Sequence, residues 1–285
     1  MTPTVWQNLR QRYHRALCDE VVWLSSAGYP NNADKSNKTS REVARLMWES
    51  IATNAGCGLS RNERKPQQVG KSFEGVTRRY LEEAFGLLQH LRPGDWRFYL
   101  NAHIQDFAQY RHLADLTEAL HAHPALRAAL GDYLIAPDII VAREPLPDEA
   151  INRGEKLVEG RTIAGLSPLR RVNNTVPLLH ASISCKWTIR SDRSQNVRTE
   201  GLNLIRNRKG HTPHIVVVTA EPHPGRLASL ALGTGDLDGV YHVALPELQQ
   251  AVAAVGDETA QGLLETMISG QRLRDISDLP LDLAA

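Results

Sequence analysis

The sequence predicts an α/β fold in which a mixed central β-sheet is flanked by α-helices. Two features support this. Apolar residues run or alternate in strand-like fashion over 133–142, 178–190 and 214–220. Helical periodicity fits the segments between and around them: 5–24, 41–53, 72–91, 103–121, 194–209 and most of 245–274. Strands that alternate with helices are typical of a single sheet covered by helices.

The chain length suits one domain. Its 285 residues can bury a sizeable core, and we expect an N-terminal helical part, about 1–125, packed on a core of about 126–285. The formal net charge is only +1, so global charge does not indicate a nucleic-acid partner. The segment from Lys186 to Gly210, however, contains seven Lys or Arg residues and only two acidic residues. The sequence therefore predicts a basic patch on a nearly neutral protein.

The cysteines and the N-terminus predict an intracellular protein. Cys18, Cys57 and Cys185 are odd in number and none pairs at metal-ligand or redox spacing. This favours a reduced compartment. Charged residues interrupt the first 24 residues, and no stretch reaches membrane-spanning length. We expect a cytoplasmic protein with no membrane partner.

The helix predicted over 72–91 shows how the helical segments are recognised. Phe73, Val76 and Tyr80 recur at three- and four-residue steps after Ser72, which is a plausible N-cap. The sequence Arg-Pro-Gly-Asp at 92–95 then ends the helix. The same periodicity predicts the other helices, and Gly210 is a natural stop for the helix over 194–209.

The strand predicted over 178–190 is the most regular. Its residues alternate between an apolar face, which includes Cys185 and Trp187, and a polar face, which includes Lys186. Lys186 is therefore expected to point away from the apolar layer. A helix and another strand follow, and sites in such units tend to lie beyond the carboxyl ends of the strands. Lys186 and Arg190 lie toward that end.

Asp138 and Lys186 are the first candidates for chemistry. Asp138 precedes Ile-Ile-Val in a predicted apolar strand, and a buried carboxylate without a partner is costly. A metal ion would supply one. Phosphodiester hydrolysis uses a hard cation, an activated water and a nearby positive group, which Mg²⁺, carboxylate oxygens and a lysine provide. Adjacent strands in one sheet would bring Asp138 and Lys186 together.

These residues resemble a known nuclease signature. Pro137-Asp138 followed by Ser184-Cys185-Lys186 resembles the PD-(D/E)xK motif, except that Ser184 occupies the slot of the second acid. In the NgoMIV-like subgroup, which cuts sites with a CCGG core, that acid comes from the following helix, fourteen positions after the lysine. Here the position is Glu200. Further matching runs are 180–193, 200–210, 213–222 and 275–283.

The resemblance implies a restriction-endonuclease-like core and a type II restriction endonuclease. It implies that Asp138, Glu200 and the backbone carbonyl of Cys185 bind Mg²⁺, with two ions per active site. Lys186 would contact the scissile phosphate and the attacking water, and would stabilise negative charge in the transition state. Glu74 matches a further acid near the active site, and Ser184 is a supporting residue.

The chemistry of the residues indicates part of the DNA sequence that the protein would recognise. Arg donates two hydrogen bonds to guanine, and Asp accepts one from cytosine. Arg190, Asp192 and Arg193 therefore suit a major groove rich in G and C. The resemblance implies GCCGGC as the site, 5′ overhangs, Gln67 as a minor-groove contact and a homotetramer that is a dimer of dimers. It also implies a cognate cytosine methyltransferase acting on the same double-stranded DNA.

Other interpretations compete with these. The arginine cluster could be a solvated turn with salt bridges of little energetic consequence. The histidines show no zinc-site spacing, and Cys185 suits packing better than nucleophilic attack. One rival function is a DNA-binding protein of the same fold that does not cut. Another is an RNA or structure-selective nuclease, although the deep, narrow major groove of RNA disfavours reading by the arginine cluster.

Overall fold

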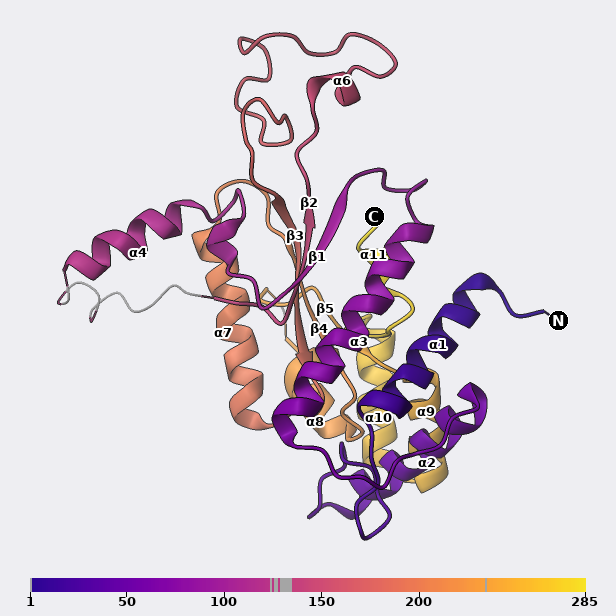
Figure 1. The fold of residues 1–285 in the computed structure, drawn as a ribbon. Coiled ribbons are helices and arrows are strands. Elements are labelled where there is room, and N and C mark those ends of the chain that lie inside the picture. The colour runs from indigo at the N-terminus through magenta and orange to yellow at the C-terminus, as the bar shows by residue number, and fades with distance from the viewer. Residues whose placement is uncertain (1, 124, 126–127, 129–134, 234) are drawn as a thin grey trace.

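The computed structural model describes residues 2–123, 125, 128, 135–233 and 235–285, with only the backbone for 191–194. Its centre is one six-stranded sheet in the order β1-β2-β3-β4-β5-β6 (Figure 1). The strands are β1 (Trp96–Leu100), β2 (Ile139–Arg143), β3 (Leu178–Lys186), β4 (His214–Thr219), β5 (Gly239–His242) and β6 (Leu273–Asp275). The first three strands pair antiparallel and the remaining pairs are parallel. The predicted mixed sheet is confirmed.

Helices surround this sheet. They are α1 (Val5–Glu20), α2 (Lys38–Ala55), α3 (Pro66–Leu87), α4 (His112–Ala122), α6 (Asp148–Ile151), α7 (Ser191–Asn207), α8 (Pro224–Ala231), α9 (Leu245–Val255), α10 (Glu258–Ser269) and α11 (Leu279–Asp282), with the short 3-10 helix η1 (Ile104–Asp106). Helix α3 packs against β1 and β3, α1 packs on α3, and α2 packs on α1 and α9 (Figure 1). The helices therefore cover the sheet as expected.

The long strand β3 is buried on both faces. Its apolar side packs in the core, and His180, Ser182 and Ser184 on the other side are also buried. The predicted polar face is therefore covered by protein rather than solvated. Parallel strands are normally covered on both sides, and β3 already has a parallel neighbour in β4.

Several element boundaries differ from the sequence prediction. Asp138 was expected inside a strand, but β2 begins one residue later, and residues 133–134 lie outside the described part of the chain. The strand predicted to reach Arg190 ends at Lys186, since Arg190 is the N-cap of α7. The single helix predicted over 103–121 is divided into η1 and α4. The helix predicted over most of 245–274 is divided into α9 and α10, and its last residues belong to strand β6. Helix α3 begins at Pro66, so Ser72 lies inside it and is not its N-cap. Strand β1 and helix α8 were not predicted, because both are short.

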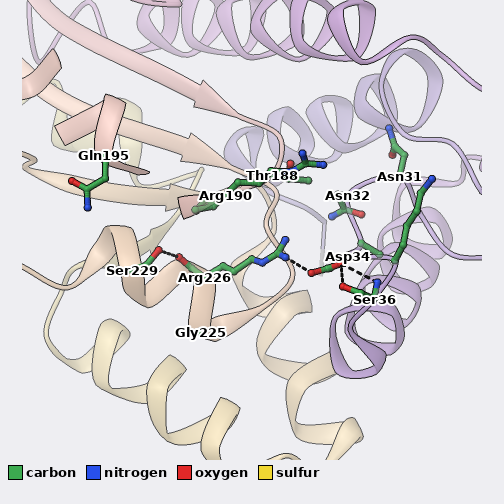
Figure 2. A pocket seen from close by; sticks show the side chains of 13 residues that line it. Asn31, Asn32, Asp34, Ser36, Thr188, Arg190, Gln195, Gly225, Arg226 and Ser229 are labelled. Carbon is green, nitrogen blue, oxygen red and sulfur yellow. Dashed lines mark hydrogen bonds and ion pairs between the residues drawn. The ribbon is translucent and has the colours of Figure 1, made fainter. Parts of the chain in front are cut away.

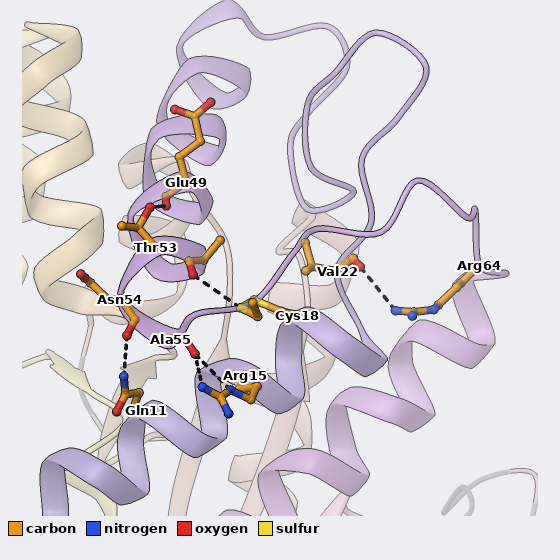
Figure 3. Close-up of a disulfide and its surroundings, with 11 residues drawn as sticks. Gln11, Arg15, Cys18, Val22, Glu49, Thr53, Asn54, Ala55 and Arg64 are labelled. Atoms are coloured by element: carbon orange, nitrogen blue, oxygen red, sulfur yellow. Dashed lines mark hydrogen bonds between the residues drawn. A yellow bond between two sulfur atoms is a disulfide. The ribbon is translucent and has the colours of Figure 1, made fainter.

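Two of the three cysteines pair in the structure, although neither their number nor their spacing indicated a disulfide. Cys18, near the end of α1, and Cys57, just after α2, form a disulfide with their Cα atoms 6.4 Å apart (Figure 3). The two cysteines are 39 positions apart in sequence, so their spacing gave no sign of the pairing. Cys185 remains a buried free thiol, as its place on the apolar face predicts.

An arm joins β2 to β3 and extends beyond the sheet, carrying α6 (Figure 1). Arg170 holds it together: its guanidinium pairs with Asp148 and donates to the carbonyl oxygens of Gly160 and Ile163. The Arg170 side chain is only 2% exposed. Large apolar side chains nevertheless face solvent on this arm: Leu157, Ile163, Leu166 and Val172.

Candidate active site

The pairing of β2 with β3 places Asp138 beside the end of the lysine-bearing strand. Ile139, the first residue of β2, pairs with Ile183 near the end of β3. Because the two strands are antiparallel, Asp138 lies beside the residues that follow Ile183. Its Oδ2 accepts a hydrogen bond from the backbone N–H of Cys185 and another from Nζ of Lys186, both at 2.7 Å. The predicted approach of Asp138 and Lys186 is therefore present.

Glu200 reaches the same place from α7. The hydroxyl of Ser184, the residue that stands in the motif slot of the second acid, interacts with the carboxylate of Glu200 and partly offsets the rise in the pKa of that group. Across the sheet edge, the charges of Lys186 and Asp138 both act on Glu200. The displaced acid and the serine that replaces it therefore lie close to each other.

Two features hold α7 where Glu200 can make this contact. Gly201 lies so close to the chain before β5 that a Cβ at this position would meet the carbonyl oxygen of Asp236 at 2.4 Å. Only glycine permits that approach. Arg198 forms a 2.8 Å ion pair with the Asp236 carboxylate and donates to the carbonyl oxygens of Leu230 and Leu232.

Glu74 joins the cluster from α3. The charges of Asp138 and Lys186 act on it, and the side chain of Asn101 interacts with its carboxylate and lowers its pKa. Asn101 follows β1 with a left-handed φ of 53°, a conformation that asparagine tolerates better than most residues. Its backbone N–H donates to the carbonyl oxygen of Asp138 at 3.3 Å. Asn101 thus connects both acids.

Burial and mutual repulsion shape the charges. Burial raises the pKa of Glu74 and of Glu200, and the nearby Asp138 carboxylate raises both further. Burial lowers the pKa of Lys186, but the Asp138 carboxylate outweighs it, so the pKa lies above its ordinary value. The cluster therefore has an ammonium group held charged among three acids that repel one another.

The donor set fits a divalent cation. Asp138, Glu200 and Glu74 offer carboxylate oxygens, which Mg²⁺ prefers. Burial, and then repulsion from Asp138, raises the pKa of Glu74 and of Glu200, as expected for acids gathered in a partly buried site. In the part of the chain that the structure describes, no three His, Cys, Asp or Glu side chains are arranged to hold an ion as they stand. Asp138 instead faces Lys186 and the N–H of Cys185.

The predicted DNA-recognition residues are less completely placed. Arg190 is exposed and lines a hollow of about 920 Å³. Gln67 is exposed near the start of α3. Asp192 and Arg193 lie in the first turn of α7, and their side chains are outside the described part of the structure.

The hollow has walls that sequence reasoning missed. Thr188 and Arg190 follow β3, Arg226 comes from α8, and the loop 31–36 contributes Asp34 (Figure 2). The Arg226 guanidinium pairs with Asp34 across the hollow. Backbone and side-chain hydrogen bonds from Ser36 lower the pKa of Asp34, and Arg226 and Arg190 lower it further. No sequence motif links these three segments, so only the fold joins them.

Comparison with known proteins decides the family. A model of the NgoMIV restriction enzyme family matches residues 13–285. The type II restriction enzyme NgoMIV of Neisseria gonorrhoeae is 48% identical over 292 residues, covering 100% of both chains. This chain belongs to the NgoMIV restriction enzyme family.

Membership confirms the predicted family, the fold class and the enzyme class of a site-specific deoxyribonuclease. An NgoMIV-family restriction enzyme implies double-stranded DNA as a partner and, in general, a divalent metal cofactor. Among the helices that the structure describes, none has the length and apolar character needed to cross a membrane. The roles of individual residues, the metal and the cleavage site are taken up below as proposals.

Proposed function

We propose that this NgoMIV-family chain hydrolyses one phosphodiester bond in each strand of double-stranded DNA at GCCGGC, a palindrome with a CCGG core, and leaves 5′ overhangs. The observation that carries the proposal is the 2.7 Å contact between Lys186 and Asp138, with Glu200 and Glu74 close enough for their charges to interact with both.

Each residue has a chemical role in this proposal. Asp138, Glu200 and the backbone carbonyl of Cys185 would bind Mg²⁺, and we propose two ions in each active site. Bound Mg²⁺ would neutralise charge on the scissile phosphate and favour ionisation of a water. Lys186, which stays protonated beside Asp138, stabilises the negative charge that develops on the phosphate oxygens. Ser184 orients Glu200, and Glu74 completes the acid cluster.

The recognition surface is the part of the protein that follows the catalytic strand. Arg190, Asp192 and Arg193 would read G and C in the major groove, because arginine and aspartate match guanine and cytosine edges. Gln67 would contact the minor groove. Since Arg190 lines the hollow, we include Arg226 and Asp34 on its other walls in the surface that faces DNA.

A palindrome requires symmetric readers, so the enzyme would act as a homo-oligomer, and we propose a homotetramer built as a dimer of dimers. The exposed apolar side chains of the arm support this, since such groups on an ordered segment are typical of interfaces. Host DNA in the bacterial cytoplasm would be protected by a cognate cytosine methyltransferase that need not touch this chain.

Plasmid digestion tests the proposal. Plasmids with and without GCCGGC are incubated with the enzyme in Mg²⁺ and in EDTA, and the product ends are sequenced. We expect discrete Mg²⁺-dependent fragments that end at this palindrome with 5′ extensions. A folded protein that binds the site and cuts neither plasmid would support the non-cutting rival. Equal competition by duplex RNA and cognate DNA would support the RNA nuclease instead.

A further inference from the structure

Glu221 is a fully buried acid outside the catalytic cluster. It follows β4 and has 0% exposed surface. Its carboxylate accepts hydrogen bonds from the backbone N–H of Ile189 at 2.8 Å and of His223 at 3.1 Å. Ile189 immediately precedes Arg190, and His223 caps α8, which carries Arg226. One carboxylate therefore holds two segments whose arginines line the same hollow.

The charges around Glu221 point to the same hollow. Oε2 of Glu221 lies 3.9 Å from the Arg226 guanidinium, which also pairs with Asp34 on the opposite wall (Figure 2). Among the residues that the structure describes, His223 before α8 and His242 on β5 are the further titratable groups beside it. Burial lowers the pKa of both histidines, so the neutral form of each persists to pH values below the ordinary histidine pKa.

We propose that Glu221 is a positioning residue for DNA sequence readout, which fixes the backbone before Arg190 and the guanidinium of Arg226 relative to each other. The inference rests on the proposed function, because it assumes that these arginines face DNA. Two arginines discriminate base pairs only when their spacing matches the groove, since bidentate hydrogen bonds are lost after small displacements. Glu221 itself, being buried, does not touch DNA.

A buried acid could instead serve stability alone, and the chain offers a matched control for that role. Glu247 on α9 is 7% exposed and accepts two hydrogen bonds from Arg10. It lines no part of the hollow. Glu221→Gln and Glu247→Gln each remove a buried negative charge with little change in volume, but only the first lies between the arginines.

Ionisation provides a readout that a purely structural role would not change. Burial raises the pKa of Glu221 to about 7. The charged form attracts Arg226 and accepts both N–H bonds, whereas protonation weakens that hold. Discrimination should therefore rise as pH rises through about 7. Glutamine resembles the protonated acid at every pH, so Glu221→Gln should abolish this rise.

The experiment compares kcat/KM for a duplex containing GCCGGC with duplexes that differ by one base pair, across pH, for wild type, Glu221→Gln and Glu247→Gln. Taking the ratio cancels titration of the catalytic groups. We expect Glu221→Gln to lower the ratio above neutral pH at least about fivefold and to flatten its pH dependence. Glu247→Gln should lower the melting temperature and leave the ratio and its pH dependence as in wild type.

An unchanged ratio in folded Glu221→Gln, or equal losses in both variants, would overturn the proposal. If Glu221→Gln does not fold, Glu221→Asp, which keeps the charge with a shorter reach, takes its place. A reduced ratio above neutral pH is then expected, and a wild-type ratio would overturn the idea. Wild-type enzyme that cuts no duplex marks failure of the proposed function itself, and is seen before any variant is compared.

Discussion

Nζ of Lys186 lies 2.7 Å from Oδ2 of Asp138, although 48 positions separate the two residues in sequence. The contact forms because β2 and β3 are antiparallel neighbours, so the start of one strand meets the end of the other. The same carboxylate oxygen also accepts the N–H of Cys185. Backbone pairing of β2 with β3 therefore fixes the relative position of the two charged side chains in the ion pair.

Lys186→Ala should remove cleavage and leave DNA binding. The variant loses the cation that stabilises developing phosphate charge, so we expect single-turnover cleavage to fall at least about 100-fold, while affinity for a cognate duplex in EDTA changes little. Lys209→Ala, which removes an exposed lysine from the basic segment, is the control and should cut normally. Loss of specific binding by Lys186→Ala would mean that the lysine is structural.

Ser184→Ala should weaken catalysis through Glu200. The hydroxyl of Ser184 interacts with the Glu200 carboxylate, and groups that orient metal ligands typically contribute about 10- to 100-fold in activity. The measurement is the cleavage rate as a function of Mg²⁺ concentration. Ser182→Ala removes a buried hydroxyl two residues earlier on the same face of β3 and should have no such effect. Equal loss in both variants would argue against the role of Ser184.

Arg190→Ala should reduce discrimination between cognate and non-cognate DNA more than it reduces the affinity for DNA in general. If Arg190 makes a bidentate contact with guanine, its loss should remove about 1–3 kcal/mol of preference for the cognate base pair. Binding to a set of single-substitution duplexes measures this. Arg206→Ala, at an exposed position late in α7, should at most weaken all duplexes alike. A uniform loss for Arg190→Ala would indicate phosphate contact instead.

Leu166→Asp should disrupt the proposed tetramer. Leu166 is 96% exposed on the arm, so the charge would cost the subunit little, whereas burial in an interface would make it unfavourable. Sedimentation velocity should show a smaller assembly than wild type. Val5→Asp, an exposed apolar position on α1, should sediment as wild type. An unchanged assembly for Leu166→Asp would exclude this part of the arm from the interface.

Arg10→Met should destabilise the fold. Arg10 donates to the carboxylates of Glu247 and Asp275, which are only 8% and 10% exposed. Removing it leaves two buried acids without their partner, and breaking such a pair costs about 3–5 kcal/mol. Denaturant unfolding measures the loss. Arg12→Met breaks an exposed pair with Glu83 and should cost less than about 1 kcal/mol; similar losses in both would contradict the role of burial.

The same network predicts acid sensitivity. Burial opposes ionisation of Glu247 and Asp275, but the hydrogen bonds from Arg10 outweigh it, so the pKa of each lies below its ordinary value. Their stabilising contribution is present above the ordinary carboxyl pKa and is lost as pH falls toward the lowered values. The free energy of unfolding, measured against pH, should fall in wild type as pH drops below the ordinary carboxyl pKa. In Arg10→Met it should fall less over the same range.

The sequence by itself determined the elements whose signal is local. Alternation and helical periodicity predicted β3, β4, α3 and α7, because spacing along a strand or helix is set by backbone geometry. The resemblance to the NgoMIV-like nuclease motif, and not spacing alone, placed Asp138, Ser184, Lys186 and Glu200 in one cluster. The short strand β1 and the loop 31–36 had no comparable pattern. Their positions depend on distant partners.

Only the tertiary structure decided which segments meet. The Cys18–Cys57 disulfide, the contact of Asn101 with Glu74, and the hollow shared by Asp34, Arg190 and Arg226 each join segments far apart in sequence. The same holds for Glu221, an ordinary acid in sequence that the fold buries against the N–H of Ile189. A single chain shows which side chains are available, whereas burial, and the pKa shifts that follow from it, exists only once the segments pack.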